Sequence, residues 1–149
     1  MRGRVRLLII WLCGASASVP LAACSSCHQP ARGFSDGLAG SAGRHGQAMT
    51  RSAPTLWNVG FLRELFWDAR ASSLEEQMQG PLFAQEEMAN TPAQLLKSLQ
   101  DNANYRELFK QAFNGESLRL EQVYTALTAF QSSLVSLSSR YDLYANGFH

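Results

Sequence analysis

Cys24, Cys27 and His28 belong to the pentapeptide Cys-Ser-Ser-Cys-His, whose residue types and spacing can do chemistry together. Cys-x-x-Cys-His is the sequence form of a covalent c-type haem site. Two cysteines three residues apart lie about one helical turn from each other, so both sulfurs can reach the vinyl groups on one porphyrin edge. The histidine that follows can then bind the iron through its imidazole. The motif therefore predicts one covalent haem c, attached through Cys24 and Cys27, with His28 as an iron ligand.

Other chemistries of this motif find less support in the rest of the chain. A zinc site needs further Cys or His ligands at close spacing, and the remaining candidates are scattered: Cys13, His45 and His149. A thioredoxin-like redox pair belongs to a βαβ pattern, and no such strand precedes Cys24. A disulfide between the two cysteines would leave His28 without a role. Haem attachment is the interpretation that uses all three residues of the motif.

The N-terminal residues have the pattern of a secretory signal peptide. Three arginines precede an apolar run from Leu7 to Leu12, and the small residues Ala15-Ser16-Ala17 offer a cleavage site. The apolar run is too short for an ordinary membrane span. We therefore expect a signal peptide at residues 1–17, export to the periplasm, and a single haem domain over residues 18–149.

Leu21-Ala22-Ala23-Cys24 also resembles a bacterial lipobox, which would place a lipid on Cys24. A lipidated Cys24 would use the sulfur that haem attachment needs, so the two interpretations exclude each other at this atom. The neighbouring Cys27 and His28 complete the haem motif, and we therefore favour haem.

The composition limits the class of partner. The 149-residue chain has 13 Lys+Arg and 12 Asp+Glu, and removal of the three signal-peptide arginines leaves 10 basic residues against 12 acidic ones. A nearly neutral, slightly acidic protein is poorly suited to bind nucleic acid. Hydrophobic residues make up 46% of the chain, which is enough for a core around a cofactor. Cys13 would leave with the signal peptide, so no cysteine pair remains for a structural disulfide.

The remaining residues predict a mostly α fold. Residues 29–52 are rich in Gly, Ser and Ala, which predicts a long glycine-rich loop. Ser73 and Glu76 predict a capped short helix that ends at Gly80-Pro81. Three further helices are predicted to start near Thr91-Pro92, Asn104 and Leu118, the second ending at Asn114-Gly115 and the third near Leu134. No convincing run of strands appears, so we expect a cytochrome c-like domain whose helices wrap around one haem.

From Cys24 to Tyr144 the order and spacing of several motifs match a known family. The matching motifs are Cys24–Pro30, Gly33–Gly37, Ala53–Asn58, Phe66–Ala71, Ser73–Gln77, Gly80–Leu82 and Glu86–Asn90. On these residues the chain resembles the N-terminal haem domain of the bacterial di-haem cytochrome c peroxidases, which include the MauG-type enzymes. The resemblance implies that this haem reacts with peroxide, while a second haem in a C-terminal domain feeds it electrons.

The resemblance also implies roles for individual residues. Glu87 matches the distal glutamate that moves a proton between the peroxide oxygens, Gln77 matches the glutamine beside it, and Pro81 lies over the same face of the haem. Trp67 matches a tryptophan on the electron route from the second haem. Cleavage of the peroxide bond needs a positioned acid–base group near the iron. Without the resemblance, Glu87 would be part of a solvated Glu86-Glu87 pair and Trp67 a core residue.

The sixth iron ligand is left open by the sequence. His45 lies in Gly43-Arg44-His45-Gly46, seventeen residues after His28. Some family members carry a histidine here that binds the resting oxidised iron and swings away on activation, a motion that the flanking glycines would make easy. The alternative is a surface histidine on a flexible loop. Methionines can also bind haem iron, although they more often fill cores, and the candidates are Met49, Met78 and Met88.

Three features depart from the family pattern. Only one Cys-x-x-Cys-His is present, so we expect the electron-feeding haem to be missing from this chain. The segment between the signal peptide and the motif is reduced to residues 18–23. Ser52 stands where the family often has an asparagine of an interdomain calcium site, which makes calcium a weaker expectation than haem. These departures suit a fragment, a degraded gene product, or an enzyme whose second half is encoded separately.

Two classes of function follow. The first is an oxidoreductase: a periplasmic haem peroxidase domain that reduces hydrogen peroxide to water with electrons from a small cytochrome or cupredoxin. It would be incomplete without a second haem domain or a homodimer partner. The second is a single-haem electron carrier without peroxidase turnover. Oxidation of another protein's side chains, as in the MauG-type enzymes, is a third and weaker interpretation because it needs both haems and a partner surface.

Overall fold

The structure of the protein is a computed structural model that describes residues 23–147. Its elements are α2 (Cys24–Cys27), η1 (Pro30–Arg32), η2 (Val59–Phe61), α3 (Leu74–Gln77), α4 (Gln79–Phe83), α5 (Pro92–Asp101), α6 (Ala103–Ala112), α7 (Leu120–Gln131) and α8 (Arg140–Ala145). Within residues 23–147, β-pairing is limited to isolated bridges. The predicted mostly α fold is confirmed. The signal peptide expected at residues 1–17 lies outside the described residues.

The predicted glycine-rich loop is confirmed, and it is held in shape by local contacts. Isolated bridges join Gln29 to Ser35 and Ala42 to Ala48. The Ala53 N–H donates to the Ser41 hydroxyl at 2.8 Å, which closes the loop on itself. A Cβ at Gly40 would overlap the Met49 carbonyl oxygen, so the close approach of the two backbone segments of the loop requires glycine there.

The segment after the loop contains two short helices where one was predicted. Ser73 caps α3 by accepting a hydrogen bond from the Glu76 N–H at 3.1 Å, as expected. The prediction that the helix ends at Gly80-Pro81 is wrong, because α4 runs through both residues to Phe83. Pro81 occupies the first turn of α4, where a missing N–H leaves no helix hydrogen bond unmade.

The boundaries of the later helices are close to the predicted ones. Thr91 and Gln94 form a complete capping box at the start of α5. The cap of α6 is Asn102 rather than Asn104, because the Asn102 side chain accepts from two backbone N–H groups of the first turn. The last predicted helix is shorter than expected, and α7 ends at Gln131.

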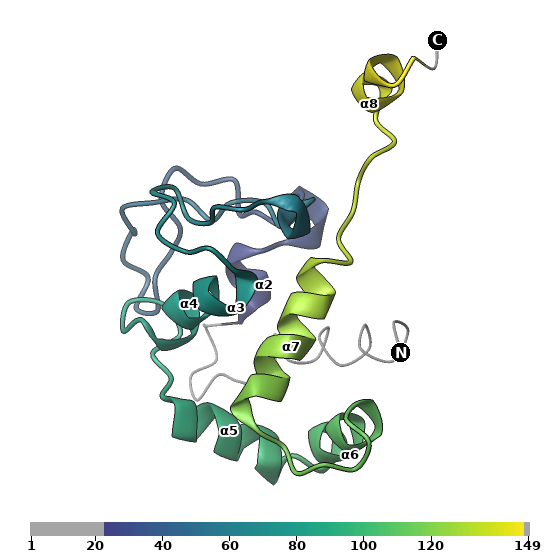
Figure 1. Ribbon diagram of the computed structural model, residues 1–149. Coiled ribbons are helices and arrows are strands. Elements are labelled where there is room, and N and C mark those ends of the chain that lie inside the picture. Colours follow the sequence, from purple (N-terminus) through teal and green to yellow (C-terminus); the bar gives the residue numbers. More distant parts are fainter. Residues whose placement is uncertain (1–22, 148–149) are drawn as a thin grey trace.

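The buried core lies mainly where α5, α6 and α7 meet. Its most deeply buried large side chains are Leu95, Leu99, Tyr105, Phe109 and Val123. In Figure 1, α5 and α6 lie at the lower end of α7, while α3 and α4 lie beside α7 and the loop residues lie above them. The helices therefore support the loop that follows the Cys-x-x-Cys-His motif.

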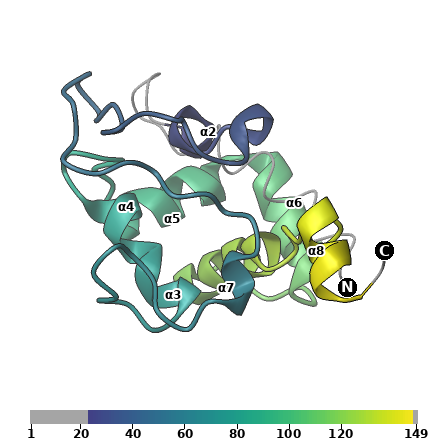
Figure 2. The ribbon, with the colours of Figure 1, turned by 90° about the horizontal axis from the view of Figure 1, so that it is seen from above.

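The C-terminal segment leaves the body of the domain after α7 and carries α8 at its end (Figures 1 and 2). Asn58 fixes the root of this segment, since its side chain donates to the Ser136 carbonyl at 2.9 Å and accepts from the Ser136 N–H at 2.8 Å. Ser139 and Asp142 form the capping box of α8. None of the helices within residues 23–147 combines the length and the apolar character of a membrane span.

Candidate haem site

The Cys-x-x-Cys-His motif forms one turn of helix, as its spacing predicts. Cys24 and Cys27 are the first and last residues of α2, and the His28 N–H donates to the Cys24 carbonyl at 2.8 Å. Neither cysteine forms a disulfide within residues 23–147, and both residues are half-buried. Two cysteines outside any disulfide on one helical turn are the arrangement that covalent haem attachment requires.

His28 is oriented by the turn that follows it. Its Nδ1 lies 2.9 Å from the Phe34 carbonyl oxygen. Because a carbonyl oxygen can only accept, Nδ1 must carry the proton, and Nε2 is left as the free nitrogen that can bind a metal. Gly33 and Phe34 both have positive φ angles, 66° and 59°, which turn the chain back toward His28. The local geometry therefore presets the histidine as a ligand.

Asp36 is a buried carboxylate next to this turn that the sequence analysis gave no role. Its side chain is among the most buried polar groups, at 3% exposure, and accepts from the Leu38 N–H at 3.0 Å. Burial raises the pKa of Asp36, but hydrogen bonds from Ser41 and Leu38, together with the nearby charge of His28, outweigh burial and hold the pKa below its ordinary value. Asp36 is therefore a fixed negative charge close to the haem motif.

Glu87 is a second carboxylate near the same motif, although it is distant in the sequence. Burial raises the pKa of the Cys27 thiol, and the negative charges of Asp36 and Glu87 raise it further. Glu87 therefore lies near α2, although 60 residues separate it from Cys27. Glu87 is half-buried, whereas its neighbour Glu86 is exposed. The two carboxylates are not an equivalent solvated pair.

The environment of Glu87 favours its protonated form. Burial raises the pKa of the Glu87 carboxyl, the positive charge of Arg70 lowers it, and Glu86 raises it, with a net upward shift. The Glu87 N–H donates to the Ala84 carbonyl at 3.1 Å, so the residue sits in a turn directly after α4. The upward shift of its pKa makes Glu87 a weaker acid than an ordinary glutamate.

Gln77 and Pro81 lie on the short helices that lead to Glu87. Gln77 is the last residue of α3, Pro81 lies in α4, and both are half-buried. Gly80 lies against the ring of Phe66, because a Cβ at Gly80 would be 2.9 Å from the Phe66 Cζ atom. This contact joins α4 to the loop that carries Trp67.

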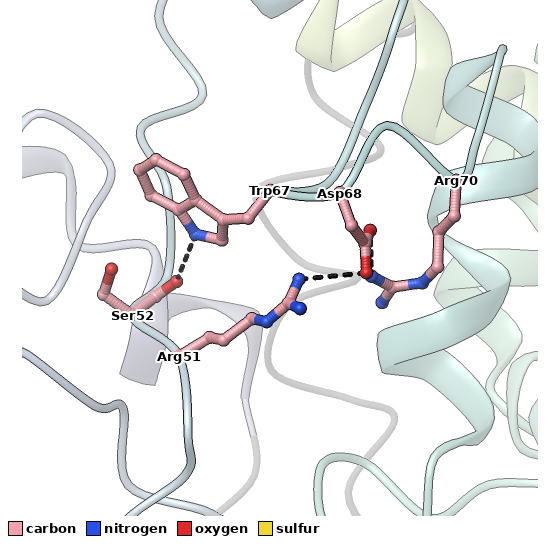
Figure 3. Close-up of polar contacts among 5 residues, drawn as sticks. All are labelled: Arg51, Ser52, Trp67, Asp68 and Arg70. Atoms are coloured by element: carbon pink, nitrogen blue, oxygen red, sulfur yellow. Dashed lines mark hydrogen bonds and ion pairs between the residues drawn. The ribbon is translucent and has the colours of Figure 1, made fainter.

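Trp67 lies on the surface, so the interpretation of Trp67 as a core residue is wrong. Its side chain is 68% exposed, and its indole N–H donates to the Ser52 carbonyl at 3.3 Å (Figure 3). A shallow, open pocket beside it is lined by Ala39, Arg51, Ser52 and Trp67.

His45 is exposed in the glycine-rich loop, with its own N–H donating to the Gln47 side-chain oxygen at 3.0 Å. The loop is tied to the turn that carries Glu87, since the Arg44 N–H donates to the Glu86 carbonyl at 2.8 Å. Of the methionine alternatives, Met78 is part of the buried core, while Met49 and Met88 are half-buried. The identity of the sixth ligand stays a prediction.

The family model described as di-haem cytochrome c peroxidase matches residues 16–149. The chain belongs to the di-haem cytochrome c peroxidase family. Proteins of this family carry haem c, which confirms the predicted type of cofactor.

Individual relatives of the di-haem cytochrome c peroxidase family show the same likeness. Cytochrome c551 peroxidase of Nitrosomonas europaea is 34% identical over 124 residues, which cover 83% of this chain and 37% of that protein. Methylamine utilization protein MauG of Methylophilus methylotrophus is 37% identical over 125 residues, which cover 84% of this chain and 37% of that protein. The chain thus spans little more than a third of the length of these relatives.

Solved structures of the family confirm the cytochrome c-like fold. A MauG-like protein associated with microbial copper homeostasis superposes with a TM-score of 0.87 and 30% identity, covering 99% of this chain and 45% of that one. The diheme peroxidase BthA from Burkholderia thailandensis E264 superposes with a TM-score of 0.82 and 28% identity, covering 95% of this chain and 42% of that one.

The residues present fit a covalent haem c of this family. Neither cysteine of α2 forms a disulfide within the described residues, so both sulfurs can form the thioether bonds, and the Nε2 of His28 can bind iron. Asp36 was not singled out from the sequence, because its burial and its hydrogen bonds with Ser41 and Leu38 are visible only in the structure. The available signal was that Asp36 falls inside the motif Gly33–Gly37 shared with the family.

Proposed function

We propose that this chain is the peroxide-reacting haem domain of a periplasmic peroxidase. It reduces hydrogen peroxide to two waters with two electrons and two protons, the electrons coming from a small cytochrome or cupredoxin. It carries one covalent haem c and works with a second haem domain or a second copy of itself. Calcium stays the weaker prediction, because Ser52 replaces the usual asparagine and its carbonyl oxygen already accepts from Trp67.

The observation that carries this proposal is the place of Glu87. A half-buried carboxyl with a raised pKa lies near the helix that binds the haem, and burial is the main cause of the shift. The haem, when attached, supplies the iron at which peroxide is reduced. The Glu87 carboxylate takes a proton from one peroxide oxygen and gives it to the other, so that the departing oxygen leaves as water.

The neighbours of Glu87 support this assignment. Gln77 and Pro81 come from α3 and α4, directly before Glu87, and both are half-buried. In the proposal, the Gln77 amide orients the peroxide, while Pro81 adds an apolar wall that carries no competing hydrogen-bond donor. Trp67, exposed beside its shallow pocket, lies on the route by which electrons reach this haem from the second haem.

A second candidate function is that of a single-haem electron carrier. The observation in its favour is that the Met49 and Met88 side chains are half-buried rather than part of the buried core. In a carrier, the thioether of one of them would complete the iron coordination.

Rapid mixing of the reduced, haem-loaded protein with hydrogen peroxide tests the proposal. We expect fast oxidation of the haem with a dependence on peroxide concentration, and sustained turnover once a reduced small cytochrome is supplied. A methionine-ligated absorption spectrum together with no reaction with peroxide would overturn the peroxidase assignment and leave the carrier.

A further inference from the structure

The turn that follows the haem motif has a backbone conformation that one of its residues disfavours. Gly33 and Phe34 have φ angles of 66° and 59°, in the left-handed region. Glycine adopts this region without a steric penalty, whereas a bulky residue such as phenylalanine is rarely found there. A conformation of this kind persists only where the surrounding structure holds it. Contacts from other segments are therefore needed to keep Phe34 in place.

Phe34 carries the carbonyl group that orients the predicted iron ligand. The His28 Nδ1–H donates to this carbonyl at 2.9 Å, and the Phe34 N–H donates to the Gln29 carbonyl at 2.8 Å. A hydrogen bond at the far nitrogen of a ligating histidine fixes the ring and makes the other nitrogen a stronger donor to the metal. The position of the Phe34 carbonyl therefore bears on the strength of the bond between His28 and the iron.

The segment from Ala53 to Trp57 is joined to this turn by hydrogen bonds. The Ser35 hydroxyl donates to the Ala53 carbonyl at 2.8 Å, and the Thr55 hydroxyl donates to the Gly33 carbonyl. The Thr55 hydroxyl oxygen also accepts from the Trp57 N–H at 3.1 Å. These bonds fix the backbone of Trp57 relative to the turn.

The Trp57 side chain packs on the same turn. Its ring meets the Phe34 ring edge to face, with the ring centroids 5.5 Å apart, and Phe130 of α7 meets the Phe34 ring in the same way at 6.3 Å. Trp57 also lies against Gly33, because a Cβ at Gly33 would be 3.7 Å from the Trp57 Cδ1 atom. Phe34 thus packs against α7 through Phe130 and against the surface residue Trp57, which is 38% exposed.

We propose that Trp57 is a positioning residue for the iron ligand. Its ring keeps Phe34 in the left-handed conformation and so keeps the Phe34 carbonyl on the Nδ1 proton of His28. Trp57 needs no contact with the haem for this role, since it acts through Phe34. Hydrogen bonding around the axial ligand is one of the means by which a protein sets the potential of a haem. The role belongs to the ligation of the haem, and therefore does not depend on peroxide being the substrate.

Loss of the Trp57 ring has an expected sign. Without the ring, Phe34 can relax toward an ordinary backbone conformation, and the hydrogen bond to His28 lengthens or breaks. The imidazole then becomes a weaker donor, which favours the reduced iron and raises the midpoint potential. Greater access of water has the opposite effect, because water stabilises the more highly charged oxidised iron and lowers the midpoint potential. The sign therefore separates the proposed role from a merely structural one.

The first measurement is a spectroelectrochemical titration of the haem-loaded protein. In Trp57→Ala the ratio of reduced to oxidised haem at a fixed potential should rise about two- to tenfold, the size of one net hydrogen bond. Trp57→Phe keeps an aromatic ring on Phe34 and should titrate close to the unsubstituted protein. Phe61→Ala is the matched control, because it removes an aromatic ring that is 63% exposed on the neighbouring η2. We expect no change of potential in this control.

Carbon monoxide gives a second readout, because it binds reduced haem iron on the side opposite His28. A weaker histidine donor strengthens the iron–carbon bond, so the iron–carbon stretching frequency should rise in Trp57→Ala at a given carbon–oxygen frequency. Resonance Raman spectroscopy measures both frequencies, and Phe61→Ala should keep the values of the unsubstituted protein. A raised potential with an unchanged iron–carbon frequency would overturn the proposal, since the effect would then not pass through His28.

The titration can also overturn the proposal by itself. An unchanged or lowered potential in Trp57→Ala, or an equal rise in Phe61→Ala, would do so. If Trp57→Ala does not load haem, Thr55→Val removes the hydroxyl that joins the Trp57 N–H to the Gly33 carbonyl and gives the same test. A raised potential in Thr55→Val would then support the proposal, and an unmoved or lowered one would overturn it.

Discussion

Residues 23–73 and residues 74–131 are stabilised by different interactions. The first region carries the haem motif and the Trp67 loop, and its buried hydrophobic side chains are Val59, Leu65 and Ala71. The second region holds the rest of the buried core, including Leu99 and Phe109, which have no exposed surface. Hydrogen bonds, ion pairs and isolated bridges shape the first region, whereas packing of apolar side chains stabilises the second.

This difference indicates that the stability of residues 23–73 depends on the cofactor more than the stability of residues 74–131 does. Burial of apolar surface is the dominant favourable term in folding, and hydrogen bonds in an exposed loop contribute much less. The helical region can therefore hold its shape from its own side chains. The loop region, which supplies Cys24, Cys27 and His28, is expected to gain much of its stability from the haem that it binds.

The largest effect is expected from removal of the attachment sulfurs. The double change Cys24→Ala and Cys27→Ala should abolish covalent haem, detected by intact mass, which would also reveal a lipid on Cys24 in the unsubstituted protein. Amide hydrogen exchange should then become fast in residues 23–73, while α5, α6 and α7 stay protected. Ser25→Ala, an exposed change in the same helix, should load haem normally. If the amides of both regions were equally protected from exchange without haem, the greater dependence of residues 23–73 on the cofactor would be contradicted.

A core substitution should act on the helical region. Phe109 is fully buried and stacks on Phe113 with ring centroids 5.7 Å apart. Phe109→Ala should lower the free energy of unfolding by about 3–5 kcal/mol, measured by denaturant titration. Leu62→Ala, at a side chain that is 60% exposed, should change it by less than about 0.5 kcal/mol. Similar losses in both variants would show that the core is not where we place it.

Asp36 links the stability of the loop region to pH. Its pKa in the folded state is held below the unfolded value, since the hydrogen bonds from Ser41 and Leu38 outweigh burial. Its contribution is therefore complete above the unfolded pKa and is lost as the pH falls through the folded pKa. At neutral pH, Asp36→Asn should cost about 1–3 kcal/mol of unfolding free energy.

The acid limb of the stability curve distinguishes this account of Asp36 from a packing effect. Asp36→Asn should flatten that limb, whereas Asp101→Asn, at an exposed ion pair with Lys97, should leave it in place. A loss of stability in Asp36→Asn that is the same at every pH would mean that the charge of Asp36 does not matter.

The smallest effect is expected from a helix cap. Thr91→Ala removes the hydrogen bond that the Gln94 N–H donates to the threonine hydroxyl at 3.2 Å, and should cost about 1 kcal/mol. The measurement is the denaturant midpoint of the haem-loaded protein. Thr125→Ala, in the exposed middle of α7, makes the same chemical change without a cap and should cost less. An equal cost at both positions would remove the capping argument.

Local signals in the sequence predicted the local parts of this structure. The turn of α2 follows from three neighbouring residues, and the start of α5 follows from Thr91-Pro92. Pro81 led to a wrong prediction of the helix end, because proline interrupts a helix only beyond its first turn, and Pro81 lies in the first turn of α4. These outcomes depend on residues a few positions apart, which a sequence pattern can show.

The contacts that build the site could not be predicted in this way. Glu87 acts on the Cys27 thiol although it lies 60 positions later in the sequence, and no periodicity records such a meeting of distant segments. The burial of Asp36 is likewise visible only in the structure. The resemblance to a family was needed to single out Glu87, and the structure was needed to single out Asp36.

The central claim is that Glu87, on the helical side of the site, moves the peroxide proton. The most direct test is the single-turnover rate of the haem-loaded protein with peroxide in Glu87→Gln and in Glu86→Gln, two equivalent changes at adjacent residues. We expect Glu87→Gln to react about 100-fold or more slowly and the exposed Glu86→Gln to keep the unsubstituted rate. Equal rates in the two variants would contradict the account.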